Sequence, residues 1–237
     1  MDITLEKKPK NPVIIEGFPG FGLIGTIGTE FLIEHLDCEK IGKIMIEGMP
    51  PVIAIHEGKL IEPIGIYYAK KYNIVVLHII SAINGMEWKI AEAVDKIAND
   101  LKAKEIVSME GVGNNNIESD TEKIFYYSNT KHKDEEFAKL KVEKLKEGIV
   151  MGVTGAILMN IKNVPVTCVF SETHSALPDS SAAAKIIGVI DKYLKLNVDP
   201  RPLLDQAKKF EEKLQSILSK SKEAEELQDK KRLNYVG

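Results

Sequence analysis

Residues 13–25 read VIIEGFPGFGLIG, and this stretch decides how the rest of the sequence is interpreted. The apolar, β-branched run at its start is typical of a strand buried in a parallel sheet. Four glycines follow it, Gly17, Gly20, Gly22 and Gly25, and they allow the chain to turn sharply out of the strand. The segment therefore predicts a strand, a tight strand-end loop and the start of a helix.

The last three of these glycines satisfy the pattern G-x-G-x-x-G, which is typical of dinucleotide-binding loops when it follows a strand. Such a site also needs an acidic residue at the end of the second strand, where Glu47 lies. Pro19 and Phe21 crowd the turn, however, and no further residues indicate hydride chemistry. We therefore treat the four glycines as a candidate ligand loop.

The composition excludes several classes of protein. The chain has 237 residues, a formal net charge of −3 and 28% charged residues, so it lacks the basic excess that nucleic acid binding requires. Its two cysteines, Cys38 and Cys168, lie too far apart in sequence to indicate a metal pair or a disulfide framework. The first ten residues lack the apolar core of a signal peptide, and no window is apolar enough to span a membrane. We expect a soluble cytoplasmic protein without membrane, nucleic acid or metal partners.

Strands and helices alternate along the chain at the spacing of a parallel α/β sheet. Helices are expected at residues 23–36, 85–103, 134–145 and 181–194, and further strands at 41–46, 73–81, 106–109, 124–128 and 164–170. An antiparallel hairpin is expected from 52–56 and 60–68. The loops 17–25, 81–87, 109–118 and 171–180 should emerge at one carboxyl edge of the sheet, where such folds place their sites.

Two prolines around Arg201 break the chain, so we divide it into a core domain, 1–196, and a helical extension with a tail, 197–237. Apolar residues in the extension recur at the interval of a heptad seam, at Leu203, Ala207, Phe210, Leu214 and Ile217. The seam could pack on the chain's own core or pair with another subunit. The chain ends in an aperiodic segment, Leu233, Asn234, Tyr235, Val236 and Gly237, that could anchor in a partner's pocket.

Candidates for catalysis are few. His174 lies in a strand-end loop beside Glu172 and Ser175, and Glu16 lies at the mouth of the first loop. A lone loop histidine is usually structural, and such a glutamate more often caps backbone amides. The sequence has no G-x-S-x-G elbow, zinc-ligand spacing or Walker motif. It therefore predicts no catalytic residue, metal or cofactor.

Three phrases together resemble the proteasome assembly chaperone 2 family of archaeal and bacterial homologues. They are GFPGFGLIG at 17–25, GVTGAIL at 152–158 and LPDSSAAA at 177–184. The third departs from the family's more usual Pro-Asp-Pro-Arg at Ser180 and Ser181. The resemblance implies a three-layer α/β/α sandwich with a mostly parallel sheet, related to phosphorylase and peptidase folds.

The resemblance also implies a homo-oligomer, a tetramer or pentamer, that binds the α-subunits of the 20S proteasome through C-terminal tails of the hydrophobic-tyrosine-X type, or a paralogous chaperone. Such a factor would assist proteasome assembly or activate the particle without catalysis. Here Tyr235 is third from the end rather than second. One alternative is a nucleotide- or nucleoside-binding enzyme that uses Gly20, Gly22, Asn114 and His174. Another is a self-assembling protein without a proteasome contact.

Overall fold

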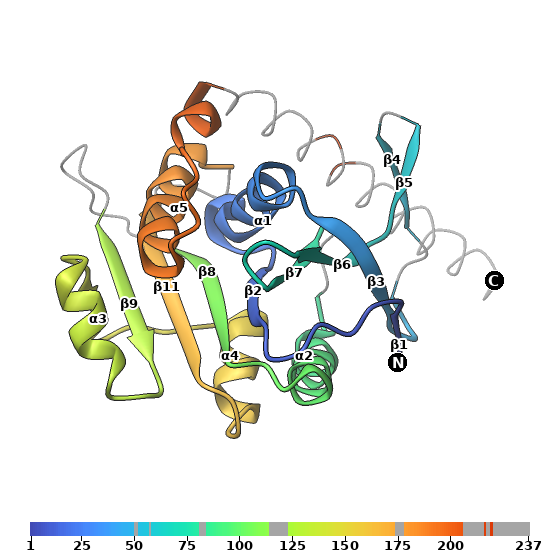
Figure 1. Ribbon diagram of the computed structural model, residues 1–237, viewed down its shortest axis with the longest axis horizontal. Coiled ribbons are helices and arrows are strands. Elements are labelled where there is room, and N and C mark those ends of the chain that lie inside the picture. Colours follow the sequence, from blue (N-terminus) through green and yellow to red (C-terminus); the bar gives the residue numbers. More distant parts are fainter. Residues whose placement is uncertain are drawn as a thin grey trace, which may run out of the picture.

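The computed structural model describes residues 1–49, 52–56, 58–80, 84–113, 123–173, 178–205, 216 and 219. Within them the chain forms one large sheet of nine strands, with helices on both faces (Figure 1). Across the sheet the strands follow the order β1 (Asp2–Leu5), β3 (Glu39–Met45), β6 (Ile64–Ala69), β7 (Ile74–Ile79), β2 (Val13–Gly17), β8 (Glu105–Gly113), β11 (Val166–Thr173), β9 (Ile124–Ser128) and β10 (Glu143–Lys144).

The centre of the sheet is parallel and its edges are mixed. Strands β7, β2, β8 and β11 run parallel, and their carboxyl ends meet at one edge. β6 is antiparallel to both of its neighbours, and β9 is antiparallel to β11. A turn of four residues joins β6 to β7, which is too short for a parallel crossover. The predicted α/β fold is confirmed.

Helices cover the sheet in two layers, which confirms the three-layer sandwich. Helices α1 (Ile24–His35) and α5 (Ser180–Leu194) lie on one face, and α2 (Glu87–Leu101) and α4 (Gly152–Asn160) on the other (Figure 1). Ile14 belongs to the apolar cluster under α2 and α4, and the next residue, Ile15, to the cluster under α1 and α5. Because both faces of the central strands are buried, they read as continuous apolar runs.

Two expected elements are divided in the structure. The second arm of the predicted hairpin is two strands, β5 (Lys59–Ile61) and β6, with Pro63 between them. Only β5 pairs with β4 (Ala54–His56), in a small separate sheet, and β6 enters the main sheet. Proline has no N–H group to donate to a ladder, so it separates the two strands. The helix expected over 134–145 ends early, as α3 (Lys133–Lys139), and β10 follows it.

The helix that begins near residue 180 starts where the sequence indicates. The Asp179 side chain accepts a hydrogen bond of 2.9 Å from the Ala182 N–H and caps α5. After α5 the chain remains on the core, because Leu196 and Leu203 are fully buried in the cluster under α1 and α5.

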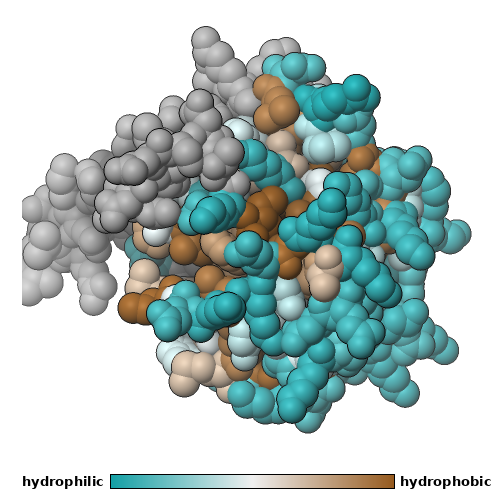
Figure 2. Space-filling model, turned by 90° about the vertical axis from the view of Figure 1, so that its left-hand side faces the viewer, coloured by the Kyte–Doolittle hydropathy of each residue, from teal (hydrophilic) through white to brown (hydrophobic). Residues whose placement is uncertain are grey.

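The side of the molecule that carries α3 and β9 is largely hydrophilic, with hydrophobic residues gathered near the centre of the view (Figure 2).

Candidate functional site

A cavity of about 640 Å³ lies at the carboxyl edge of the parallel strands. Four segments enclose it: the loop after β2, the end of β8, the chain that enters α4, and Phe170 of β11. Its described lining residues are Phe18, Pro19, Gly20, Phe21, Glu110, Gly111, Val112, Gly113, Gly148, Ile149, Val150, Met151, Gly152, Val153 and Phe170. Both the volume and the position are typical of small-molecule sites in α/β proteins.

The glycine loop is held close to the sheet by backbone contacts. A Cβ atom on Gly17 would lie 2.0 Å from the Gly25 carbonyl oxygen, and one on Gly25 would lie 2.5 Å from the Met109 oxygen. Gly22 has φ +64° and is followed by Leu23 with φ 49°, so the chain passes through the left-handed region before α1 begins. These glycines therefore allow α1 to start in direct contact with β2 and β8.

The space in front of Gly22 is occupied by protein. A Cβ atom on Gly22 would lie 2.9 Å from Thr173 Oγ1 and 3.2 Å from Asp179 Cβ, and the Gly22 carbonyl accepts a 2.8 Å hydrogen bond from the Asp179 N–H. Gly20 is different, because a Cβ atom there would point at Glu110 Oε2 from 2.8 Å away. Of the four glycines proposed as a ligand loop, Gly20 lines the cavity and the other three pack on protein atoms.

Two glutamates, Glu16 buried and Glu110 half-buried, form the floor beneath this loop. Glu16 of β2 is fully buried, and Glu110 of β8 lines the cavity. Thr154 of α4 connects them, because its hydroxyl lies 2.5 Å from Glu110 Oε1 and 3.4 Å from Glu16 Oε1. The Ser108 hydroxyl is 3.1 Å from Thr154 Oγ1, whereas Glu16 Oε2 has no hydrogen-bond partner. The β2–β8 pairing places Glu16 opposite Ser108, which brings these groups together.

Burial controls the protonation of both carboxyl groups. Desolvation raises the pKa of Glu16 well above its usual range, and the nearby charge of Glu110 raises it further. Desolvation also raises the pKa of Glu110 from 4.5 to about 7, although the hydrogen bonds from Thr154 and the Gly111 backbone oppose the rise. Burial therefore favours the protonated form of Glu16, and the charge of Glu110 develops around neutral pH.

Both cysteines are inert thiols. Burial raises the pKa of the Cys38 thiol to about 12 and that of Cys168 well above its usual value, and nearby carboxylates add to both effects. A thiol with a raised pKa is a poor nucleophile and a poor metal ligand. The part of the chain that the structure describes contains no group of three or more histidine, cysteine, aspartate or glutamate side chains that could hold a metal.

The structure places several residues of the sequence hypotheses away from the cavity or outside the described residues. Glu47 is exposed after β3, and β6 and β7 separate that strand from β2, so Glu47 does not lie beside the glycine loop. Leu203, the first of the heptad positions, is fully buried in the core of this chain. Outside the described residues lie Asn114, His174, the heptad positions Ala207, Phe210, Leu214 and Ile217, and the tail Leu233, Asn234, Tyr235, Val236 and Gly237.

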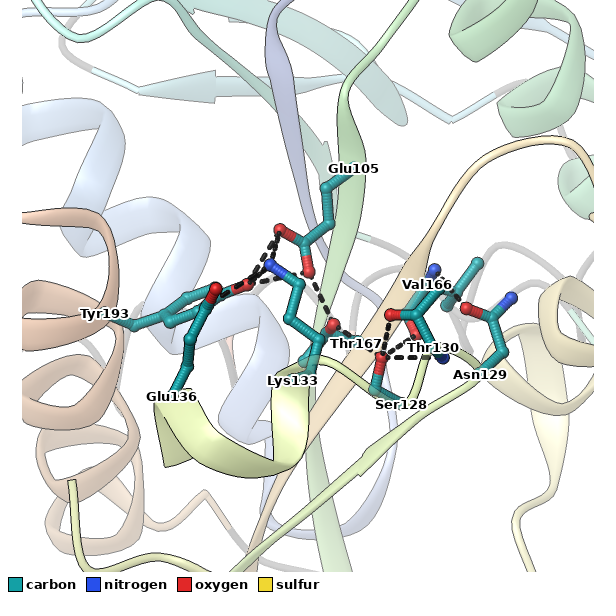
Figure 3. Close-up of polar contacts among 9 residues, drawn as sticks. All are labelled: Glu105, Ser128, Asn129, Thr130, Lys133, Glu136, Val166, Thr167 and Tyr193. Carbon is teal, nitrogen blue, oxygen red and sulfur yellow. Dashed lines mark hydrogen bonds and ion pairs between the residues drawn. The ribbon is translucent and has the colours of Figure 1, made fainter. Parts of the chain in front are cut away.

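A second polar cluster lies at the opposite end of β8, and the sequence did not indicate it. Figure 3 shows Lys133 of α3, Tyr193 of α5 and Thr167 of β11 converging on Glu105. Lys133 Nζ is 3.0 Å from Glu105 Oε2, and the Tyr193 hydroxyl donates to the same carboxylate at 2.8 Å. This carboxylate is paired and hydrogen-bonded throughout, so the cluster connects α3, α5 and the sheet and has a structural role.

A third buried group lies between α1 and β7. His78 is 1% exposed, and its Nδ1 atom lies 2.8 Å from the Thr29 hydroxyl. Its Nε2 atom lies 2.9 Å from Glu30 Oε2. The order of groups resembles a hydrolase triad, but Thr29 is fully buried inside α1 and also donates to the Gly25 carbonyl. We therefore assign these side chains to helix–sheet packing.

Comparisons with known proteins agree with the fold. A model of the PAC2 family matches residues 14–218. An uncharacterized protein of Methanocaldococcus jannaschii is 30% identical over 215 residues, which cover 88% of this chain and 86% of that protein. None of the helices in the described ranges combines the length and the hydrophobicity that a membrane span needs.

Solved structures extend the likeness over nearly the full chain. Pyrococcus furiosus PbaA, described as an archaeal homolog of proteasome-assembly chaperone, is 29% identical with a TM-score of 0.85, and the match covers 94% of this chain and 99% of that one. A protein of unknown function from Thermoplasma acidophilum is 25% identical, with a TM-score of 0.82 over 96% of this chain and 93% of that one. The family resemblance drawn from the three sequence phrases is confirmed, and the chain belongs to the PAC2 family.

Proposed function

We propose that this chain is a non-enzymatic proteasome-associated factor of the cytoplasm, which assembles into a homo-oligomer and binds the 20S α-ring through its C-terminal tail. The observation that carries the proposal is the match to PbaA, a proteasome-assembly chaperone homologue, over 94% of this chain. The proposal assigns the core the role of a scaffold and assigns the contact with the α-subunits to residues 233–237.

Exposed apolar side chains on the surface support a role in protein–protein contact. On the small sheet and the chain before it, Ile53, Ile55 and Leu60 are more than half exposed, and Figure 1 shows β4 and β5 projecting beyond the main sheet. Trp88, at the start of α2, and Met151, just before α4, line a second hollow and are also more than half exposed. Exposed apolar groups that lie together are typical of interaction surfaces.

The route from the core to the tail supports the scaffold role. Leu203 is fully buried, so the chain is anchored on the core at that point. Residues 207–217 continue the heptad spacing, which favours pairing between subunits. An oligomer would present several copies of the tail, and several weak contacts to a ring gain affinity when their spacing matches the pockets of the ring.

The tail has suitable chemistry for a pocket between two subunits. An aromatic ring supplies contact area, and the terminal carboxylate can pair with a lysine. Tyr235 is third from the end, whereas the tyrosine of a hydrophobic-tyrosine-X tail is second. The terminal carboxylate therefore lies further from the tyrosine side chain, by one residue or about 3.3 Å of extended chain. We propose that the bound tail shifts its register to accommodate the extra residue.

Deletion of residues 233–237 tests the proposal. The truncated protein is expected to keep its native mass and to lose co-elution with 20S particles. As a matched pair of single variants, Tyr235→Ala should also lose co-elution and Asn234→Ala should keep it. Co-elution of the truncated protein at the level of the full chain would contradict the assignment of the tail.

The enzyme alternative is less favoured by the cavity. A nucleotide would bring phosphate charge to a pocket whose one ionisable group, among the lining residues described, is the Glu110 carboxyl. The negative phosphate and the ionised Glu110 carboxylate would repel each other. We therefore expect no thermal shift with NAD or ATP, and a clear shift with either of them, or with a nucleoside, would favour the enzyme.

A further inference from the structure

We propose that the strand-end cavity is a binding site for a small apolar or aromatic molecule that carries a protonated amine, with Glu110 as the counter-charge. The proposal concerns the core domain and does not depend on the proteasome contact. Three observations carry it: the apolar walls, the single carboxyl among the described lining residues, and the hydrogen-bond chain behind that carboxyl.

The walls of the cavity select an apolar ligand body. Phe18 and Phe170 are buried at its inner end, and Phe21, Ile149 and Met151 are exposed at its rim. Exposed apolar side chains around a hollow lose unfavourable contact with water when a ligand covers them. A volume of about 640 Å³ accommodates a molecule the size of an aromatic amine.

The carboxyl group of Glu110 determines which ligand charge the cavity favours. Glu110 is the one ionisable side chain among the described lining residues, and its Oε2 atom lies on the Gly20 side, next to the cavity. An anionic ligand would be repelled by this carboxylate. A neutral apolar ligand would remove the ionised carboxylate from water without supplying a counter-charge, which is costly. A protonated amine pairs with it and avoids both costs.

The hydrogen-bond chain behind Glu110 decides which carboxyl is ionised. The Thr154 hydroxyl has one proton and contacts both Glu110 Oε1 and Glu16 Oε1. It can donate to one of them at a time, and the shorter contact, 2.5 Å against 3.4 Å, favours Glu110 as the acceptor. Glu16 is fully buried with an unpartnered Oε2 atom, and it is the group that burial keeps protonated. The negative charge therefore belongs to Glu110, at the cavity wall.

Affinity should depend on pH in a defined direction. Among the described residues, the titratable groups that face Glu110 are Glu16 from β2 and Cys168 from β11, and burial raises the pKa of both and so favours their protonated forms. Burial raises the pKa of Glu110 to about 7, so its charge develops between pH 6 and 8. Amine binding should strengthen over this interval and level off once the carboxyl is fully ionised.

The test compares ligands of one shape and different charge. Wild-type protein is titrated at pH 8 with hexylamine, 2-phenylethylamine and tryptamine, and with 2-phenylethanol and phenylacetate, by calorimetry and ligand-observed NMR. At least one amine should bind, and 2-phenylethylamine should bind at least tenfold more tightly than its alcohol and acid counterparts. Binding of the acid as tight as that of the amine, or no binding of any amine below 10 mM, would overturn the proposal.

Three variants separate the site from the rest of the surface. Glu110→Gln should weaken amine binding at least tenfold and remove its pH dependence. Met151→Lys, at an exposed rim position, should block the site by supplying a competing ammonium group. Glu92→Gln removes the same charge from an exposed position on α2 and should leave binding unchanged. An amine affinity that stays within twofold of wild type in Glu110→Gln, or in Met151→Lys, would overturn the proposal.

Discussion

Replacement of Glu110 by glutamine should stabilise the folded protein, because the native carboxyl is costly to ionise where it lies. The fold raises its pKa from 4.5 to about 7, whereas in the unfolded chain the group titrates near its ordinary value. The folded state therefore binds more protons than the unfolded state between these two pH values, and this carboxyl makes stability fall as the pH rises through that window. Each pKa unit is equivalent to about 1.4 kcal/mol, so the full cost above pH 7 is roughly 3 kcal/mol.

Glutamine removes this titration while its side-chain oxygen still accepts from Thr154. Because the carboxyl faces an open cavity, solvent screens part of the cost, and we expect a gain of about 2 kcal/mol at pH 8. For a chain of this size that gain raises Tm by roughly 4–8 °C.

The assay is denaturant unfolding of both proteins from pH 4 to pH 8.5. The difference between them should be smallest near pH 4 and grow as the pH approaches 8. The exposed control Glu92→Gln should follow wild type throughout. A variant that is no more stable than wild type at pH 8, or a difference that does not change with pH, would refute the reasoning.

Two further substitutions test the packing of the fold. Lys133→Met should destabilise the protein by about 3–5 kcal/mol in denaturant unfolding, because it leaves Glu105 as a buried charge without its cation; a loss under 1 kcal/mol would contradict this assignment. Gly17→Ala should cost about 3 kcal/mol or more, because its Cβ would meet the Gly25 carbonyl at 2.0 Å. Gly188→Ala in α5 is the matched control, with no atom near its added methyl group, and it should stabilise the helix by about 0.5–1 kcal/mol. Similar unfolding midpoints for the two alanine variants would contradict the packing role of Gly17.

Local signals in the sequence predicted the elements that depend on local chemistry. The β-branched run before the glycines is β2, and the Pro-Asp pair before residue 180 marks the capped start of α5. The hairpin forms between β4 and β5, but its second arm is shorter than the sequence predicts, because an apolar segment on each side of Pro63 can continue one strand or start another. Which of these happens depends on β7, since β6 pairs with it along its full length.

The acidic floor of the cavity could not be predicted, because the register of distant strands creates it. Glu16 and Glu110 are 94 positions apart in the sequence, and Thr154 is 44 positions beyond Glu110. In the sequence, Glu16 lies at the mouth of a loop, where a glutamate usually caps backbone amides. Only the pairing of β2 with β8 shows that its side chain is buried beside a second carboxyl. A strand-end loop rich in glycine predicts where such a pocket lies, without predicting its charge.

The two acidic clusters of β8 show why one end of this strand is a candidate site and the other is not. At the amino end, Glu105 is neutralised by Lys133 and receives hydrogen bonds from Tyr193 and Thr167, so its burial is fully compensated. At the carboxyl end, Glu110 has no cation among the described lining residues of its cavity. A buried network that is fully satisfied stabilises the fold, whereas an uncompensated carboxyl lowers stability for as long as its cavity is empty. Binding of a cation there would recover that loss, and this difference distinguishes a ligand site from a structural ion pair.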